Sequence, residues 1–183
     1  LGGRRLFILA AALVLFLVAF VLNKYLIGAA SSPFYADLIQ KDIVAKERSF
    51  QRLAKDTPLL TSLINRSYGE RTLNRVSAQR MGFFFFIYAR DTSTVGQHKL
   101  LFWNTQQALP PMNIMNESNA SRLVRLSNGL YVHTSLSIEL PGGRQYALES
   151  LQPVLWRYFV ENENLRKEFV SYPEAGKRVD ISF

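Results

Sequence analysis

Alternating side chains between Leu130 and Leu140 include the groups in this chain that are best suited to bind a small ligand. Successive side chains of a strand point to opposite faces, so one face would carry Leu130, Val132, Thr134, Leu136, Ile138 and Leu140. The other face would carry Tyr131, His133, Ser135, Ser137 and Glu139, beside Tyr146 or Glu149 of the next strand. That second face is either a ligand-binding surface or, as the sequence favours, a solvated side of an antiparallel sheet.

A second group of candidate residues lies near the ends of two earlier strands. Trp103 and Asn104 end one strand, opposite the end at which Tyr88 leaves its own strand. An aromatic plate and an amide are the mixture of groups that a ligand pocket uses. A structural Trp with its indole N–H on a backbone carbonyl is the competing and more common case. The candidate ligand-binding set is Tyr88, Trp103, Asn104, Tyr131, His133, Tyr146 and Glu149.

The sequence offers no pattern typical of catalysis or of metal binding. His98 and His133 are the only histidines, and neither stands at helical spacing from a second ligand. Cysteine is absent, which excludes thiolate metal sites and cysteine nucleophiles. There is no phosphate-binding glycine loop, nucleophile elbow or HExxH motif. We therefore expect no catalytic residue, metal or cofactor in this chain.

The N-terminal region predicts one transmembrane helix over residues 6–27. Leu6 to Leu22 contain no polar side chain, and Leu26-Ile27 extend the apolar segment. A helix of ~20 apolar residues crosses a bilayer. A cleaved signal peptide that ends at Gly28-Ala29-Ala30 is the alternative interpretation, although the apolar run is longer than such a peptide needs.

The charges beside this segment predict its orientation. Arg4 and Arg5 precede it, so the positive-inside rule places residues 1–5 in the cytoplasm and residues 31–183 outside. We expect a single-pass protein of the inner membrane with a periplasmic domain. The net charge is +8, but the basic residues are scattered, which argues against nucleic acid as a partner. The last residues, Asp180 to Phe183, resemble the start of a strand, so we expect a longer protein in which this domain continues.

The region after the membrane segment predicts helices followed by strands. Ser32-Pro33 suits a helix start, and the apolar spacing continues to Asp56, with Pro58 ending the helix. Two short helices should follow, before and after Gly69. The Phe-rich run of residues 82–89 is too short to span a membrane and predicts a strand buried on both faces.

Five strands and a final helix are expected from the rest of the chain. The strands are GFFFFIYA (82–89), KLLFWNT (99–105), SRLVRL (121–126), LYVHTSLSIEL (130–140) and RQYALESLQPV (144–154). Residues 156–170, WRYFVENENLRKEFV, have apolar spacing that favours a helix. The predicted fold class is α+β, with a five-stranded antiparallel sheet packed by the long N-terminal helix. This order, two strands, a long connecting segment and three more strands, resembles the core of PAS-like sensor domains of the Cache type.

Four segments resemble a family in order and spacing: FIYARD (86–91), LLFWNTQQALPP (100–111), LVRLSNGLYV (123–132) and YFVENENLRKEF (158–169). They are similar to the extracytoplasmic input region of large membrane-bound sensor histidine kinases of the Bacteroidetes type. The sequence departs from that pattern at Leu130, where an aromatic residue is usual. It also contains no second membrane span, HAMP segment, phosphoacceptor helix or ATP-binding domain, so no kinase residue is transferred to it.

The resemblance implies signal input to a two-component system. ATP and Mg²⁺ would bind only in a kinase domain outside this sequence, and a response regulator would be the partner there. The resemblance also implies a homodimer through the long helix, with Leu38, Ile39, Ile43, Phe50 and Leu53 as the dimer or signalling residues. The signal would be an unknown small ligand or an envelope protein. A non-enzymatic single-pass protein that presents a periplasmic interaction domain is the alternative function, and an envelope enzyme is a more distant one.

Overall fold

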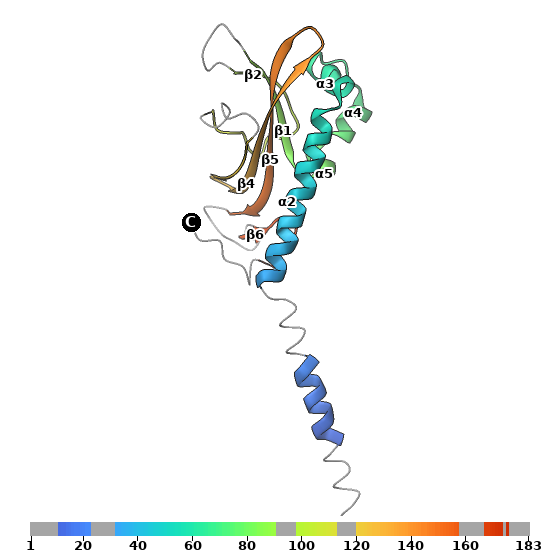
Figure 1. Cartoon of the computed structure of the whole chain (residues 1–183), viewed down its shortest axis with the longest axis vertical. Helices are drawn as coiled ribbons and strands as arrows, with labels where there is room; N and C mark the ends of the chain where they lie inside the picture. Colours follow the sequence, from blue (N-terminus) through green and yellow to red (C-terminus); the bar gives the residue numbers. More distant parts are fainter. Residues whose placement is uncertain are drawn as a thin grey trace, which may run out of the picture.

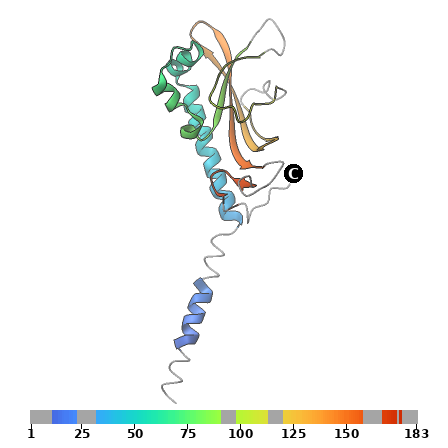
Figure 2. The same cartoon turned by 180° about the vertical axis from the view of Figure 1, so that it is seen from behind.

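A curved antiparallel sheet with helices along one of its faces makes up the folded part of the chain (Figures 1 and 2). The computed structural model describes residues 11–22, 32–90, 98–112, 120–157, 167–173 and 175. Within them, helices come first in the chain and strands follow, as the sequence predicts. The fold is therefore α+β.

The helices of the folded part are α2 (Ser32–Ala54), α3 (Thr57–Ile64), α4 (Glu70–Arg75) and α5 (Ala78–Met81). The Asp56 side chain caps α3 by accepting a hydrogen bond from the Leu59 N–H at 3.2 Å. Pro58 lies in the first turn of α3, where its missing N–H costs nothing, so the prediction that it ends the long helix is wrong. The long helix itself is present almost as predicted.

The strands are β1 (Phe84–Arg90), β2 (His98–Trp103), β3 (Ala120–Leu126), β4 (Gly129–Leu140), β5 (Arg144–Trp156) and β6 (Glu168–Phe169). Five of them form an antiparallel sheet in the order β2-β1-β5-β4-β3, and β6 pairs with β5. The predicted hairpin and three-stranded meander are both present. They join through β1 and β5, which therefore lie at the centre of the sheet.

The predicted helix over residues 156–170 is wrong in the part that the structure describes. Trp156 is the last residue of β5, and Glu168–Phe169 form the sixth strand; residues 158–166 lie outside the described part. Phe169 pairs with Leu155 and is buried together with Leu130. Of the apolar residues that gave a helical spacing, Trp156 and Phe169 thus belong to strands of the sheet.

The face of the sheet toward α2 carries the larger apolar core. Phe50 and Leu53 of α2 are buried with Phe85 and Ile87 of β1 and Leu148 of β5. The rings of Phe50 and Phe83 lie edge to face at 5.8 Å, a favourable geometry for aromatic pairs. The Phe-rich strand is indeed buried on both faces, because Phe84 and Phe86 point to the opposite side.

Four of the five predicted dimer residues of α2 pack within the chain. Phe50 and Leu53 are in the core, and Ile39 and Ile43 pack against a second cluster near β6; Leu38 is half-buried. Phe34 of the same helix is exposed. Dimerisation through α2 stays a prediction.

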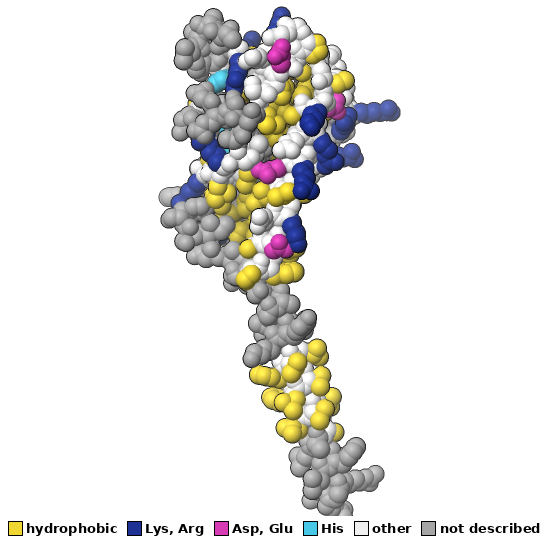
Figure 3. Space-filling view, in the orientation of Figure 1, with side chains coloured by type: hydrophobic (Ala, Val, Ile, Leu, Met, Phe, Trp, Pro, Cys, Tyr) yellow, Lys and Arg dark blue, Asp and Glu magenta, His cyan; other side chains and the backbone are white. Residues whose placement is uncertain are grey.

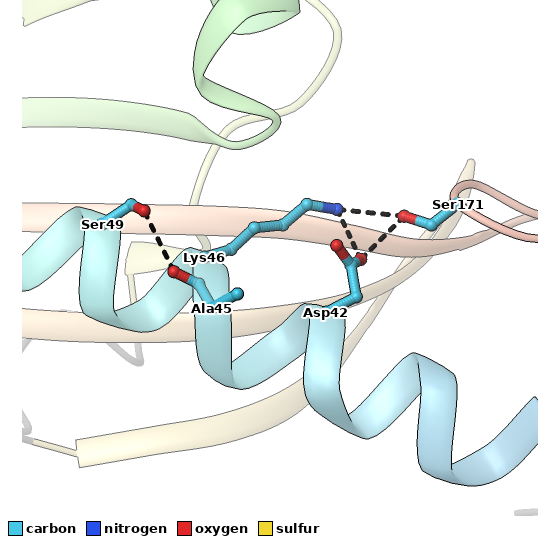
Figure 4. Close-up of polar contacts among 5 residues, drawn as sticks. All are labelled: Asp42, Ala45, Lys46, Ser49 and Ser171. Atoms are coloured by element: carbon cyan, nitrogen blue, oxygen red, sulfur yellow. Dashed lines mark hydrogen bonds and ion pairs between the residues drawn. The ribbon is translucent and has the colours of Figure 1, made fainter.

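A polar contact fastens α2 to the segment that follows β6 (Figure 4). The Lys46 ammonium lies 2.7 Å from the Asp42 carboxylate and donates to Ser171 Oγ at 3.1 Å. Ser171 Oγ donates in turn to the same carboxylate at 2.7 Å. Each member thus contacts the other two, and we call this group the Lys46 clasp.

Part of the predicted membrane segment is also described. Residues 11–22 form a helix whose residues are all exposed, and the space-filling view shows apolar side chains over its visible surface (Figure 3). Residues 6–10 and 23–27 lie outside the described part. Within the part of the chain that the structure describes, none of the helices combines the length and the apolar character needed to cross a bilayer.

Replacement of Gly129 should destabilise the sheet. A β-carbon at this position would collide with the carbonyl oxygen of Leu155, which is a backbone atom of the paired strand and cannot turn away. We expect Gly129→Ser to lower the free energy of unfolding by about 1–3 kcal/mol. Gly69→Ser is the matched control, because an added β-carbon there meets no atom within 4 Å and Ser is a good N-cap for α4. Urea unfolding that gives equal midpoints for both variants would contradict the expectation.

Candidate functional site

A buried carboxylate lies between two polar side chains of the neighbouring strand. Glu149 of β5 is paired with Ser135 of β4, and His133 stands two residues earlier on the same face. His133 Nε2 lies 2.6 Å from Glu149 Oε2, and Ser135 Oγ donates to Glu149 Oε1 at 2.8 Å. All three side chains are at most 1% exposed. We call His133, Ser135 and Glu149 the buried polar cluster.

Aromatic side chains surround this cluster on the face of the sheet away from α2. The pairing of β1 with β5 places Phe86 opposite Glu149 and Tyr88 opposite Ala147. Tyr131 lies on the same face of β4 and donates from its hydroxyl to Asn128 Oδ1 at 2.9 Å. These rings exclude water from the carboxylate and make its hydrogen bonds stronger than they would be in solvent.

Residues after β2 help to cover this face. Ala108 packs with Phe84, Tyr88 and Tyr131. Asn128, whose oxygen accepts from Tyr131, donates from its side-chain nitrogen to the Gln107 carbonyl at 2.9 Å. The same asparagine thus connects the covering segment to the sheet.

The surroundings of the cluster change the pKa of Tyr88. Burial, and secondarily the negative charge of Glu149, raises the pKa of the Tyr88 phenol to about 12. Burial disfavours the charged phenolate, and a nearby carboxylate adds like-charge repulsion. Tyr88 therefore stays neutral and able to donate a hydrogen bond throughout the physiological range.

The geometry of the cluster suits recognition better than nucleophilic catalysis. An activated serine needs its hydroxyl on the imidazole of a base, which is in turn oriented by an acid. Here the carboxylate is the central group, and Ser135 donates to it rather than to His133. His133 Nδ1 is buried and has no hydrogen-bond partner among the described residues, so it is the nitrogen of the cluster whose hydrogen-bonding capacity is unused there.

Metal binding has no support in the described part of the chain. No three His, Asp or Glu side chains there come close enough together to hold an ion. The buried polar cluster has one carboxylate and one imidazole, and these are already bonded to each other.

The structure brings together four of the seven predicted site residues. One face of the sheet carries Tyr88, Tyr131, His133 and Glu149. His133 and Glu149 are hydrogen-bonded to each other, and Tyr88 and Tyr131 belong to the same buried apolar cluster. The interpretation of this face as solvated is wrong for its central part, because Tyr131, His133 and Ser135 are buried. Only the far end of β4, at Ser137 and Glu139, is exposed.

The other three predicted residues lie elsewhere. Trp103 is on the same face but at the outer strand, where it is 45% exposed. Asn104 has a structural role, since its oxygen accepts from the Phe85 N–H at 2.8 Å and its amide donates to the carbonyls of Val76 and Phe83. Tyr146 faces the α2 side of the sheet.

Sequence reasoning did not include Ser135 and Phe86 among the site residues. A signal was nevertheless present in ALESLQPV, where Glu149 is the one charged residue of the segment. A carboxylate in such a position must have partners close by, since an unpaired buried charge is costly. The residues of β4 at the matching register were the place to look for them.

Among the described residues, surface hollows outside the cluster include three that differ in charge. The first, of about 300 Å³, is near Asp56 and Arg75, which form an ion pair at 2.9 Å. The second, of about 460 Å³, lies beside Trp103 and Leu73 and is lined by no charged residue. The third, of about 670 Å³, lies between the end of α3 and the ends of β1, β2 and β5 and is lined by several basic side chains.

Comparison with protein-family models, with curated proteins and with solved structures gives no match to this chain. Its function is therefore inferred from the buried polar cluster, from the helix that packs behind it and from the residues of the sequence itself.

The stability of the protein should fall as the pH rises from 10 to about 12. In the unfolded chain Tyr88 has the ordinary tyrosine pKa of 10, so there it releases its proton before the folded protein does, and deprotonation favours unfolding. Below pH 10 the folded and the unfolded protein both keep the Tyr88 proton, so the contribution of Tyr88 to stability is fully retained. Tyr88→Phe should make the decline in unfolding midpoint shallower, as measured in urea at pH 9, 10 and 11. Tyr172→Phe is the control, and an equal effect of both substitutions would argue against the assignment.

Glu149→Gln provides a second measurement of the same interaction. Removal of the negative charge should move the pKa of Tyr88 from about 12 part of the way back toward 10, with burial still keeping it above that value. Tyrosinate absorbance near 295 nm, with Tyr88→Phe as the blank, would report this shift. If the part of the titration due to Tyr88 occurred at the same pH in this variant, the charge of Glu149 would not contribute to the pKa of Tyr88.

Proposed function

We propose that this chain is the extracytoplasmic signal-input domain of a membrane-anchored sensor histidine kinase. The observation that carries the proposal is that strands β4 and β5 hold the buried polar cluster on one face and pack against α2 on the other. A change at the cluster therefore reaches the helix through the thickness of a single sheet.

The membrane anchor in this proposal is the segment over residues 6–27, with the N-terminus in the cytoplasm and the sensor domain in the periplasm. Support comes from the uninterrupted apolar sequence of residues 6–22 and from Arg4 and Arg5 before it. α2 is the first element of the domain after this segment. It would thus receive any displacement of the sheet and pass it toward the membrane.

The proposed input is a small polar ligand or an envelope partner that contacts the cluster. His133 Nδ1 offers it a hydrogen-bonding position, and the Tyr88 phenol offers a neutral donor. A ligand shifts a two-state equilibrium only by the difference in its affinity for the two states. In a dry site, a ligand that exchanges a buried hydrogen bond of the carboxylate would favour the state in which the new bond forms.

The PAS/Cache-like character of the domain and its kinase context also belong to the proposal. The strand layout supports them, since the hairpin and the meander join at the centre of one sheet. The kinase domain, with its ATP, Mg²⁺ and response regulator, would follow in the longer protein, and dimerisation through α2 stays a prediction.

Removal of the whole buried polar cluster should separate folding from signalling. Replacement of a buried ion pair by apolar residues of similar volume is often neutral for stability, whereas loss of one partner costs about 3–5 kcal/mol. We expect His133→Leu, Ser135→Ala, Glu149→Met together to keep a melting temperature close to the parent, and Glu149→Ala alone to lower it. In the complete gene product, the triple variant should change the autophosphorylation rate at least about fivefold.

The control for that experiment is the pair Ser137→Ala, Glu139→Gln, which lies on the same strand and is exposed. Its autophosphorylation should equal that of the parent. An unaltered rate in a well-folded triple variant would count against a role of the cluster in signalling. A gene product without kinase activity would favour the alternative, an anchored protein that presents an interaction domain.

The proposed topology can be tested directly because the chain has no cysteine. A single cysteine at Lys55, an exposed position after α2, should react with a membrane-impermeant maleimide once the outer membrane is made permeable. A single cysteine at Gly2 should react only after the cells are lysed. Equal labelling of the two positions before lysis would exclude this orientation, and recovery of the Lys55→Cys protein in a soluble fraction would favour the cleaved signal peptide.

A further inference from the structure

The hollow between α3 and the end of the sheet has a concentration of positive charge. Arg90, Lys99 and Arg144 line it from three different strands, and no Asp or Glu is among its described lining residues. We call this hollow the basic groove. It differs from the hollow near Asp56, where a carboxylate pairs with Arg75, and from the one beside Trp103, which has no charge.

Strand register explains why two of these cations gather. Ala89 of β1 pairs with both Lys99 of β2 and Tyr146 of β5, so these side chains share the α3 side of the sheet. Arg144 begins β5 two residues before Tyr146 and therefore faces the same side. Arg90 lines the groove from the end of β1. The nearest acid in register is Glu139, which is paired with Gln145 and does not line the groove. The strand ends thus bring Lys99 and Arg144 together on one concave surface, with Arg90 at its border.

The neighbouring helix end opposes an anion less than a helix C-terminus with unpaired carbonyls would. Three of the last four carbonyls of α3 are occupied, since Thr61, Ser62 and Leu63 accept hydrogen bonds from the N–H groups of Asn65, Ser67 and Arg66. Lys99 and Arg144 are exposed, and no ion pair joins either of them to an acid in the described part of the chain. Their charge is thus available to a ligand.

We propose that the basic groove binds a small organic anion with more than one charged group, either carboxylates or a phosphate ester. The volume of about 670 Å³ falls within the range of small-molecule sites. Asn65, Gln145 and Tyr146 add uncharged hydrogen-bonding groups, and the apolar wall around Leu101 favours an organic ligand over a bare inorganic ion. Guanidinium and ammonium groups recognise both carboxylate and phosphate oxygens.

The experiment is calorimetric titration of the full chain in detergent micelles with citrate and with glucose 6-phosphate. Uncharged glucose is the ligand control. We expect at least one of the two anions to bind, with affinity that falls as NaCl is raised, and glucose not to bind. The anion that binds more tightly identifies the class, carboxylate or phosphate ester. Absence of binding by both anions overturns the proposal.

Paired variants distinguish the groove from the general positive charge of the protein. Lys99→Gln, Arg144→Gln together should weaken binding at least tenfold. Arg48→Gln, Lys55→Gln, which remove the same charge from exposed positions in and just after α2, should change it less than twofold. Equal losses in both double variants would overturn the proposal. The measurement is independent of autophosphorylation, so its outcome does not decide the signalling role of the buried polar cluster.

Discussion

The burial of one carboxylate constrains the centre of this fold. Glu149 stands in the middle of a strand that is covered on both sides, and a charge without partners there would strongly destabilise the domain. His133 and Ser135 satisfy it only if β4 is in its observed register. A slip of one residue would turn both to the opposite face, so the polar interaction specifies the pairing of the two longest strands as firmly as the apolar pattern does.

Coverage of both sheet faces follows from the same constraint. On one side α2 buries Phe85, Ile87 and Leu148; on the other, aromatic rings and the segment around Ala108 close over the carboxylate. The two sides are separated by the sheet alone, and alternate residues of each strand serve one or the other. A substitution that disturbs one side is therefore felt on the other through a backbone that both share, which is the physical basis of the proposed signal path.

The sequence predicted the elements that depend on local patterns. The helix that begins at Ser32 and the Phe-rich strand both have short-range signals in capping and apolar spacing. Burial of the face around His133 was not predicted, because it depends on residues after β2 that are distant in the sequence. The strand at Phe169 was missed for the same reason: its apolar spacing fits a helix, and only the contact with Leu155 decides otherwise. The structural role of Asn104 was equally hidden, since its three hydrogen bonds go to residues that are distant in the sequence.

The Lys46 clasp has a mechanical consequence. It joins the middle of α2 to the chain just after β6, so the segment that enters the domain and the segment that follows its last strand are held at a common point. The clasp adds to the apolar contacts of Ile39 and Ile43 with the cluster that includes Phe169, so α2 and the chain just after β6 are joined in two ways. A displacement of α2 would therefore be passed to this segment, and loss of the clasp would leave the apolar contacts alone to hold the two together.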